Sequence, residues 1–389
     1  MAYQDAGSGP RDCHHFFAGG VSVIPFLFFL TTASEPVILS AAGAKDLLLR
    51  YVSIAHGSFA HARPARSLRM TSLVTFGEAM VRLSPPALQL LEQASTLAAS
   101  VGGSELNVAV LAARLGVTSR WVSRLPDNAL GRMIGARARE QGVDAHVEWT
   151  ADGRVGLYFV EIGGARISSV LYDRAGSAIS RVTPGSVDWA SVFAGARWYH
   201  VSGITPALSD TAAKVTAESL AAAKRAGLTV SYDLNYRAKL WSAKQACTVQ
   251  EPLLEHVDVL TTTAEDARVV LGIGYDDHAE VARALQKRFE LSAVAITLRD
   301  NPVAAVIAAD GKIHSASRFD VESVDPIGAG DAFCGGLIVS RLEHRGWDDA
   351  VRFATATAAL KHTIPGDFCL VTRNEVDQLL RGASLRVSR

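Results

Sequence analysis

The chain has 389 residues, of which 39 are Lys or Arg and 39 are Asp or Glu, so its formal charge is zero. Hydrophobic residues make up 49% of it and charged residues 20%, which supports a large packed core and excludes a disordered chain. A neutral chain without a long Lys/Arg run lacks the positive field that phosphate backbones attract, so we expect no nucleic-acid partner.

Four cysteines are spread over the chain, with neither a Cys-x-x-Cys pair nor a His at zinc-ligand spacing: Cys13, Cys247, Cys334 and Cys369. This pattern indicates neither a disulfide framework nor a zinc module, and we expect no metal-ligating cluster. It is typical of a reducing compartment. We therefore expect a cytoplasmic protein.

The first 69 residues differ from the rest. Residues 16–34 are strongly apolar but include two glycines and a proline, and their apolar run is shorter than the ~20 residues of a membrane helix, so we expect no membrane partner. A signal peptide would need a more basic start. Because Met70 opens a buried-strand pattern, we expect the fold to span 70–389 and 1–69 to come from an incorrect start. A genuine targeting segment is the alternative.

From residue 70 onward, strand and helix patterns alternate. The predicted strands are Leu73–Phe76, Arg120–Ser123, Trp198–Val201, Thr229–Asp233, Val257–Thr261 and Val294–Leu298. The predicted helices include Glu105–Leu115, Leu130–Gln141 and Thr211–Arg225. Strands separated by amphipathic helices predict an α/β fold with a mostly parallel central sheet and helices on both faces.

Residues 155–172 break this alternation, because two strand-like runs flank Gly163 and Gly164 with no helix between them. This is the signature of a β-hairpin. We expect a small β lid over about 153–175. An edge hairpin without a function is the alternative.

Residues 325–336 read DPIGAGDAFCGG and place Gly328, Ala329 and Gly330 where a helical pattern begins. The first N–H groups of a helix have no intrahelical acceptor and carry partial positive charge, so this turn can accept an anion. Asp331 follows at once. Such a carboxylate is ordinarily a cap, but beside an anion-binding turn it can orient a hydroxyl for phosphoryl transfer.

Neither a Walker-type G-x-x-x-x-G-K-[ST] sequence nor the protein kinase signatures occur in the chain. From about residue 70 to its end, the chain resembles the ribokinase-like (PfkB) carbohydrate kinases. Two separated signatures carry the resemblance: GGSELNVAVLAARLG at 102–116 and DPIGAGDAFCGG at 325–336. Within the family it is most similar to the 2-keto-3-deoxygluconate kinases, through GLYFVE at 156–161, LYDRAGSA at 171–178, DLNYRAKLW at 233–241 and LKHTIPGDF at 360–368.

The resemblance implies the catalytic roles. Asp331 corresponds to the family's general base, which takes the proton of the sugar hydroxyl. The backbone N–H groups around Gly328, Ala329 and Gly330 correspond to the anion hole for the transferring phosphoryl group, where fixed donors stabilise developing charge.

The resemblance also implies the sugar-side residues. Gly102, Gly103 and Asn107 match the segment that cradles the sugar, although two glycines before a helix also fit a tight turn with Ser104 as the N-cap. Further matches are Tyr158, Tyr172, Arg174 and Arg237. A sugar acid carries a carboxylate, which a guanidinium binds through two parallel hydrogen bonds. The two tyrosines also fit a simple cross-strand pair.

On the nucleotide side, Thr263 and Asp266 stand where the family has the Asn and Glu of an N-x-x-E motif near the phosphates and magnesium. Thr297 and Arg299 are implied on the adenosine side, and Lys361 near the adenine pocket. A solvated position at a helix end is the alternative for Lys361. We expect Mg²⁺ to arrive bound mainly by the phosphates of ATP.

The resemblance thus predicts ATP-dependent phosphorylation of 2-keto-3-deoxy-D-gluconate to its 6-phosphate. The alternatives are a kinase of fructose, ribose or 2-keto-3-deoxygalactonate, or a non-catalytic sugar-binding regulator. Because related enzymes pair their lids, we expect a homo-oligomer.

Overall fold

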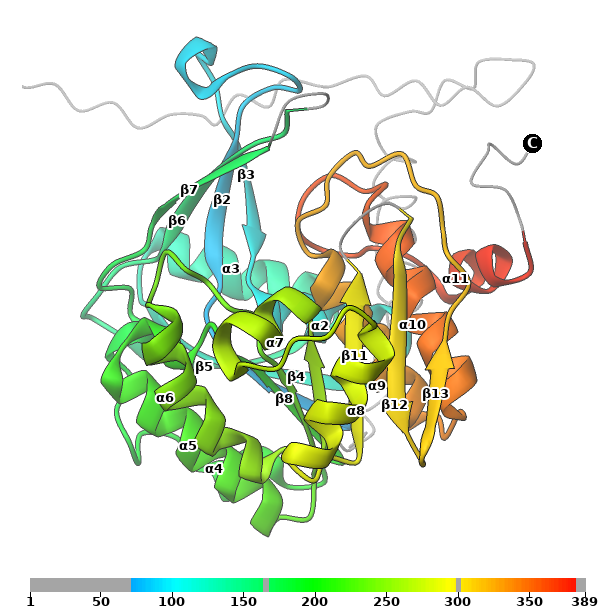
Figure 1. The fold of residues 1–389 in the computed structure, drawn as a ribbon. Helices are drawn as coiled ribbons and strands as arrows, with labels where there is room; N and C mark the ends of the chain where they lie inside the picture. Colours follow the sequence, from blue (N-terminus) through cyan, green and yellow to red (C-terminus); the bar gives the residue numbers. More distant parts are fainter. Residues whose placement is uncertain (1–70, 164–167, 299–301, 383–389) are drawn as a thin grey trace, which may run out of the picture. The chain divides into compact units, whose positions relative to one another are not determined.

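The computed structural model describes residues 71–163, 168–298 and 302–382, which lie in one compact unit, Leu68–Arg389. Within these residues the centre is a nine-stranded sheet in the order β13-β12-β11-β10-β9-β8-β1-β4-β5 (Figure 1). Its strands are β1 (Leu73–Phe76), β4 (Ser119–Pro126), β5 (Asp144–Thr150), β8 (Trp198–Ser202), β9 (Thr229–Asp233), β10 (Val259–Thr262), β11 (Ala293–Leu298), β12 (Ala304–Ala309) and β13 (Lys312–Ser315).

The strands from β5 to β11 pair in parallel, and only β12 and β13 add antiparallel at one edge. Parallel sheets are covered on both faces, so their strands are apolar throughout; all four residues of β1 are buried. Because the carboxyl ends of parallel strands meet at one edge, ligands bind there in open α/β sheets.

Helices cover both faces of the sheet (Figure 1). The helices are α2 (Ser104–Arg114), α3 (Ala129–Glu140), α4 (Trp189–Phe193), α5 (Asp210–Arg225), α6 (Ala243–Leu253), α7 (Ala264–Leu271), α8 (His278–Arg288), α9 (Ala329–Leu342), α10 (Trp347–Lys361) and α11 (Arg373–Leu380), with short 3₁₀ turns at Leu91–Gln93, Ile179–Arg181, Pro206–Leu208 and Leu254–His256. Successive residues of β1 point to opposite faces. Leu73 belongs to the core cluster that includes residues of α2, α9, α10 and α11, whereas Val74 belongs to the cluster that includes residues of α4 to α8.

A second sheet forms the lid, which rises above the helices in Figure 1. As described, it has four strands in the order β3-β2-β6-β7: β2 (Met80–Ser84), β3 (Ala98–Gly102), β6 (Leu157–Glu161) and β7 (Ser169–Asp173). β6 and β7 form the predicted antiparallel hairpin, with Tyr158 opposite Tyr172. Residues 164–167 of its turn, including Gly164, lie outside the described residues.

The α/β class, the mostly parallel sheet and the small lid are confirmed. The lid is larger than the predicted hairpin, because β2 pairs in parallel with β6 and antiparallel with β3. Val81 and Val101 of these strands join a core cluster with residues of α2 and α3. The lid is therefore built on the same helix that begins at Ser104. In the part of the chain described, no helix is long and apolar enough to span a membrane.

Glu105 fixes the start of α2 to the central sheet. Its buried carboxylate Oε1 accepts hydrogen bonds from Ser202 N at 3.0 Å, Ser202 Oγ at 2.7 Å and Thr205 Oγ1 at 2.9 Å. Burial raises the pKa of Glu105 from 4.5 to about 7, although these hydrogen bonds oppose the rise. In the folded state Glu105 therefore stays protonated up to a higher pH than a solvated glutamate does.

We expect Glu105→Gln to change how stability depends on pH. In the unfolded chain Glu105 ionises near its ordinary pKa of 4.5, so the wild-type free energy of unfolding falls as pH rises from about 4.5 to about 7. The loss is up to about 3 kcal/mol at ~1.4 kcal/mol per pKa unit. Glutamine keeps the acceptor without the charge. The melting temperature of the variant should therefore rise relative to that of the wild type as pH increases from about 4.5 to about 7.

The control is Glu265→Gln, which changes an exposed carboxyl group. Its melting curve should follow that of the wild type at every pH. If the melting temperatures of Glu105→Gln and wild type change in parallel with pH, Glu105 does not have a raised pKa.

Candidate active site

A cavity of about 940 Å³ opens between the carboxyl ends of the central strands and the lid. Its walls include the ends of β9, β10 and β11, the residues that follow β7, and the first turn of α9. The predicted site residues that line it are Tyr172, Arg174, Arg237, Thr263, Thr297, Gly328, Ala329, Gly330 and Asp331. The predicted site residues that do not line it are Gly102, Gly103, Asn107, Tyr158, Asp266 and Lys361. Arg299 lies outside the described residues.

Asp331 lies in the first turn of α9 and faces α2. Ser104 Oγ donates to Asp331 Oδ1 and Asn107 Nδ2 donates to Oδ2, each at 2.6 Å. Burial raises the pKa of Asp331 above its ordinary 3.8, although both hydrogen bonds and the charge of Arg237 oppose the rise. The carboxylate is thus held in one orientation at the cavity wall, with a stronger basicity than a solvated aspartate has.

Gly328 makes the turn before α9 possible. Its φ of 90° is in the left-handed region, which residues other than glycine rarely adopt. A Cβ there would lie 2.3 Å from the carbonyl oxygen of Asp367. The N–H of Ala329 donates to Pro326 O at 3.2 Å. The N–H groups of Gly330 and Asp331 follow in the first helical turn, where a helix offers donors to an anion.

The side chain of Asn107 makes hydrogen bonds within the protein. Its amide nitrogen donates to Asp331, and its Oδ1 accepts from Gly103 N at 3.3 Å. Gly102 packs closely: a Cβ there would lie 2.3 Å from both Asp367 Oδ2 and Tyr158 Oη. Asn107 thus orients the carboxylate of Asp331, and Gly102 packs where strand β3 of the lid ends. Contact of these residues with a sugar stays a prediction.

The two tyrosines of the lid differ in position. Tyr158 is buried and stacks on Tyr172, with ring centroids 6.0 Å apart, and burial together with the charge of Asp367 raises its pKa well above 10.0. Tyr172 lines the cavity. The hairpin therefore contains the cross-strand tyrosine pair and also forms part of the cavity wall, and contact of either tyrosine with a sugar stays a prediction.

The two arginines of the cavity differ in their partners. Arg174 pairs with Glu78, and both side chains are almost buried; its guanidinium also lies 5.5 Å from the ring centroid of Tyr172. Among the described residues, the guanidinium of Arg237 has no hydrogen-bond or ion-pair partner, yet its charge lowers the pKa of Asp331. Arg237 is thus the cavity guanidinium with free donors.

The nucleotide-side residues have structural partners as well. Thr263 is the N-cap of α7, and its Oγ1 accepts from Asp266 N at 3.0 Å. Asp266 is a buried residue of the first turn of this helix. Thr297 Oγ1 donates to Thr262 O at 3.4 Å. Lys361 is fully buried, which excludes the solvated alternative. Its role toward adenine stays a prediction.

Comparison with known proteins gives the family. The model of the pfkB family carbohydrate kinases matches residues 70–367, more than half of the chain. The chain belongs to this family. It is 40% identical over 318 residues to the 2-dehydro-3-deoxygalactonokinase of Haloferax volcanii, covering 82% of this chain and 99% of that protein. It is 31% identical over 320 residues to the 2-dehydro-3-deoxygluconokinase of Thermoproteus tenax, covering 80% and 95%.

The fold of this carbohydrate kinase is also similar to a solved relative. The crystal structure of 2-dehydro-3-deoxygluconokinase from Thermotoga maritima superposes with a TM-score of 0.78 and 38% identity, covering 80% of this chain and 98% of that one. The predicted resemblance to the ribokinase-like (PfkB) kinases and the predicted sugar kinase activity are confirmed.

Sequence reasoning missed several residues that surround the kinase site without lining its cavity. Glu78, Arg82, Asp325 and Asp367 are buried charged residues next to it, and Ser104 was considered only as a helix cap. Asp325 and Asp367 fall inside the DPIGAGD and LKHTIPGDF segments, which could have drawn attention to them. Glu78 and Arg82 carry no local signal, because their partners lie far along the chain.

Two glycine substitutions should separate stability from activity. Gly328→Ala should lower the melting temperature and the kcat, because the left-handed backbone costs about 1–2 kcal/mol and its Cβ meets Asp367 O. Gly330→Ala should leave the melting temperature unchanged or higher, since no atom lies within 4 Å of its Cβ and alanine favours helices. Its methyl group would enter the cavity beside Asp331, so kcat/KM should fall about tenfold or more.

Thermal unfolding and steady-state kinetics of the two variants measure this contrast. A Gly330→Ala enzyme with wild-type kcat/KM would contradict the view that the transferring group passes over this turn.

Proposed function

We propose that this carbohydrate kinase transfers the γ-phosphoryl group of ATP to the terminal hydroxyl of a 2-keto-3-deoxy sugar acid, with 2-keto-3-deoxy-D-gluconate as the leading substrate. The observation that carries the proposal is that Asp331 and the unpartnered guanidinium of Arg237 line the same cavity. A carboxylate on the substrate supplies the partner that Arg237 lacks. A neutral sugar does not.

In this reaction Asp331 is the general base. Ser104 and Asn107 orient its carboxylate, so that the substrate hydroxyl donates to Asp331 and points its oxygen at the γ-phosphorus. As the new O–P bond forms, the bond to ADP breaks and the proton passes to Asp331. The free N–H groups of the first turn of α9 hold the charge of the transferring group without reorganisation.

Mg²⁺ would neutralise charge on the phosphates of the donor. Among the described residues there is no cluster of three or more His, Cys, Asp or Glu that could hold a metal ion. We therefore expect ATP to carry Mg²⁺ into the cavity, as is usual for this ion. Thr263 and Thr297, which line the same cavity, are the residues proposed to contact the nucleotide.

The galactonate epimer is the second candidate substrate. It is supported by the 40% identity to a relative named 2-dehydro-3-deoxygalactonokinase. Both epimers carry the carboxylate that Arg237 would bind, and they differ in the configuration of one hydroxyl-bearing carbon. An enzyme that accepts both is compatible with the same site.

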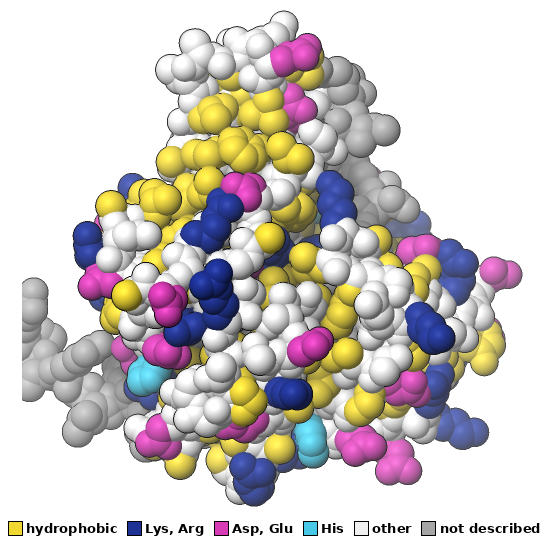
Figure 2. Space-filling model, turned by 90° about the vertical axis from the view of Figure 1, so that its left-hand side faces the viewer, with side chains coloured by type: hydrophobic (Ala, Val, Ile, Leu, Met, Phe, Trp, Pro, Cys, Tyr) yellow, Lys and Arg dark blue, Asp and Glu magenta, His cyan; other side chains and the backbone are white. Residues whose placement is uncertain are grey.

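A homo-oligomer is proposed from the outer face of the lid. Leu171 of the edge strand β7 is 60% exposed and pairs across from Phe159, and hydrophobic side chains gather over this part of the molecule (Figure 2). An exposed apolar face of this kind marks a contact surface. Light scattering of the purified chain measures the assembly, and a monomer at micromolar concentration would contradict it.

We expect Arg237→Ala to raise the KM for the sugar acid by about 10- to 100-fold, the range of one charge-assisted hydrogen bond. The KM for ATP should change by less than about threefold on that view. Coupled ADP release over both keto acids, fructose and ribose is the assay. Arg268→Ala, at an exposed arginine outside the cavity, is the matched control. Equal kcat/KM on fructose and on the keto acids would overturn the acid-specific proposal.

Asp331→Asn should abolish turnover while calorimetry still detects binding of the sugar acid. The amide keeps the shape but cannot accept the hydroxyl proton. In the wild type, kcat/KM should be lost as pH falls through the raised pKa of Asp331, because the base must be ionised. Sugar binding without any turnover by the wild type would instead favour the non-catalytic regulator.

A further inference from the structure

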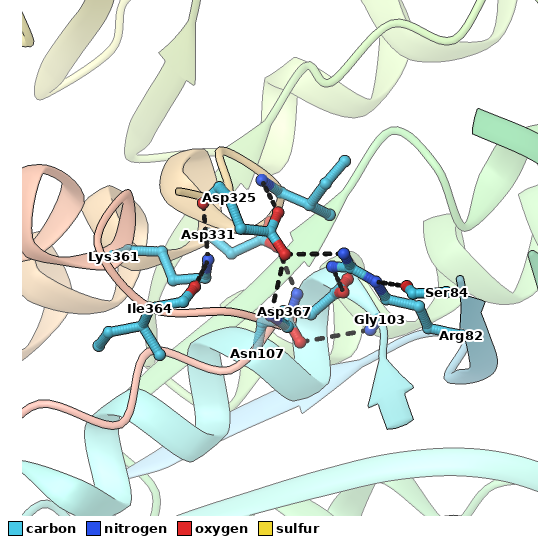
Figure 3. A network of polar contacts seen from close by, with 11 residues as sticks. Arg82, Ser84, Gly103, Asn107, Asp325, Asp331, Lys361, Ile364 and Asp367 are labelled. Carbon is cyan, nitrogen blue, oxygen red and sulfur yellow. Dashed lines mark hydrogen bonds and ion pairs between the residues drawn. The ribbon is translucent and has the colours of Figure 1, made fainter. Parts of the chain in front are cut away.

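A cluster of four charged side chains is buried between the lid and the loops that flank α9 and α10. It consists of Arg82, Asp325, Lys361 and Asp367, each with at most 5% of its surface exposed (Figure 3). Two cations thus face two carboxylates. Buried charges are tolerated when they are paired and hydrogen-bonded, and here the pairing joins segments that are far apart in sequence.

Asp325 is held from three directions. Its Oδ2 accepts from Arg82 Nη2 at 2.7 Å and from Gly366 N at 2.9 Å, and its Oδ1 accepts from Ile327 N at 3.0 Å. Its backbone oxygen accepts from Lys361 Nζ at 3.1 Å, and the same ammonium donates to Ile364 O at 3.0 Å. Because Asp325 stands three residues before Gly328, these contacts fix where the first turn of α9 begins.

Asp367 joins the same turn to the lid. Its Oδ1 accepts from Arg82 Nη1 at 2.9 Å, and its backbone oxygen lies where a side chain on Gly328 would be. Its other carboxylate oxygen lies against Gly102 at the end of β3. Burial raises the pKa of Asp367, and the charge of Arg82 opposes the rise.

Arg82 is the only residue of these four that belongs to the lid sheet. It lies on β2, and its Nε donates to Ser84 Oγ at 2.9 Å. Its three nitrogens therefore make three directed hydrogen bonds, to the lid itself, to Asp325 and to Asp367. The planar fork of arginine suits this arrangement, whereas a lysine ammonium is a point charge.

We propose that Arg82 is a positioning residue for phosphoryl transfer: it fixes the anion-binding turn at Gly328 against the lid that covers the sugar. The inference rests on the roles proposed above for Asp331 and the first turn of α9. It does not depend on which sugar is the substrate, since none of the cluster residues lines the cavity.

Arg82→Lys tests the proposal. The substitution keeps the buried positive charge but cannot keep all three directed bonds. We expect kcat to fall by about 10- to 100-fold, the cost of misplacing catalytic groups. Dissociation constants for the sugar and for a non-hydrolysable ATP analogue should stay within about threefold, because the cavity lining is unchanged.

The matched control is Arg120→Lys. Arg120 also bridges strands, with Nε 2.9 Å from Asp144 Oδ2 and Nη1 2.9 Å from Val192 O, but it does not line the cavity. The Arg120→Lys variant should have a lower melting temperature than the wild type but the same kcat. If Arg82→Lys behaves in the same way, with kcat per folded molecule within threefold of wild type, the proposal is overturned.

A second pair of variants keeps the test informative if Arg82→Lys does not fold. Asp367→Asn retains an acceptor for Arg82 Nη1, so its kcat should stay within about threefold of the wild-type kcat. Asp367→Ala removes the acceptor and should repeat the loss expected of Arg82→Lys. Equal kcat for both Asp367 variants would overturn the proposal.

All arms use the sugar that the wild-type enzyme phosphorylates fastest. A substrate other than a keto acid would therefore overturn the proposed substrate and leave this test intact. Turnover by Asp331→Asn would overturn the proposed base, whatever Arg82→Lys does.

Discussion

The contact between the first turns of α2 and α9 is the constraint on which the site depends. Ser104 and Asn107 each hold one oxygen of Asp331, and Glu105, between them in sequence, anchors α2 to the end of β8. Because the carboxylate has donors on both oxygens, it cannot turn away from the cavity without losing charge-assisted hydrogen bonds. The first turn of α9 and the carboxylate of Asp331 are therefore held rigidly against α2.

Buried ion pairs surround the contact between α2 and α9. The pair of Glu78 and Arg174 sits at one wall of the cavity, whereas Arg82 and Lys361 compensate Asp325 and Asp367 behind it. Removing one partner of such a pair leaves an uncompensated buried charge, which costs several kcal/mol. Arg237 stands apart because its guanidinium has no partner among the residues described, and that imbalance makes it available to an anionic ligand.

The sequence predicted features with a local signal. The strands Leu73–Phe76 and Thr229–Asp233 have the predicted bounds, because buried parallel strands are short apolar runs between turns. The strands β2 and β3 escaped prediction, since each depends on pairing within the lid more than on its own pattern. The same holds for the ion pairs: Glu78 is 96 residues from Arg174, and Arg82 is 285 residues from Asp367. Only the folded chain brings such groups together.

That separation also sets an order of events during biosynthesis. The ribosome makes the amino-terminal part of a domain first, and the domain folds as a unit. The strands β1 and β2 emerge early, whereas both carboxylate partners of Arg82, Asp325 and Asp367, are made much later, and Asp367 is the last of the four charged residues in the chain. Until residue 367 has emerged and docked, the guanidinium of Arg82 lacks one of its two carboxylate partners. The buried cluster around Arg82 can thus be completed only after nearly the whole kinase domain has been translated.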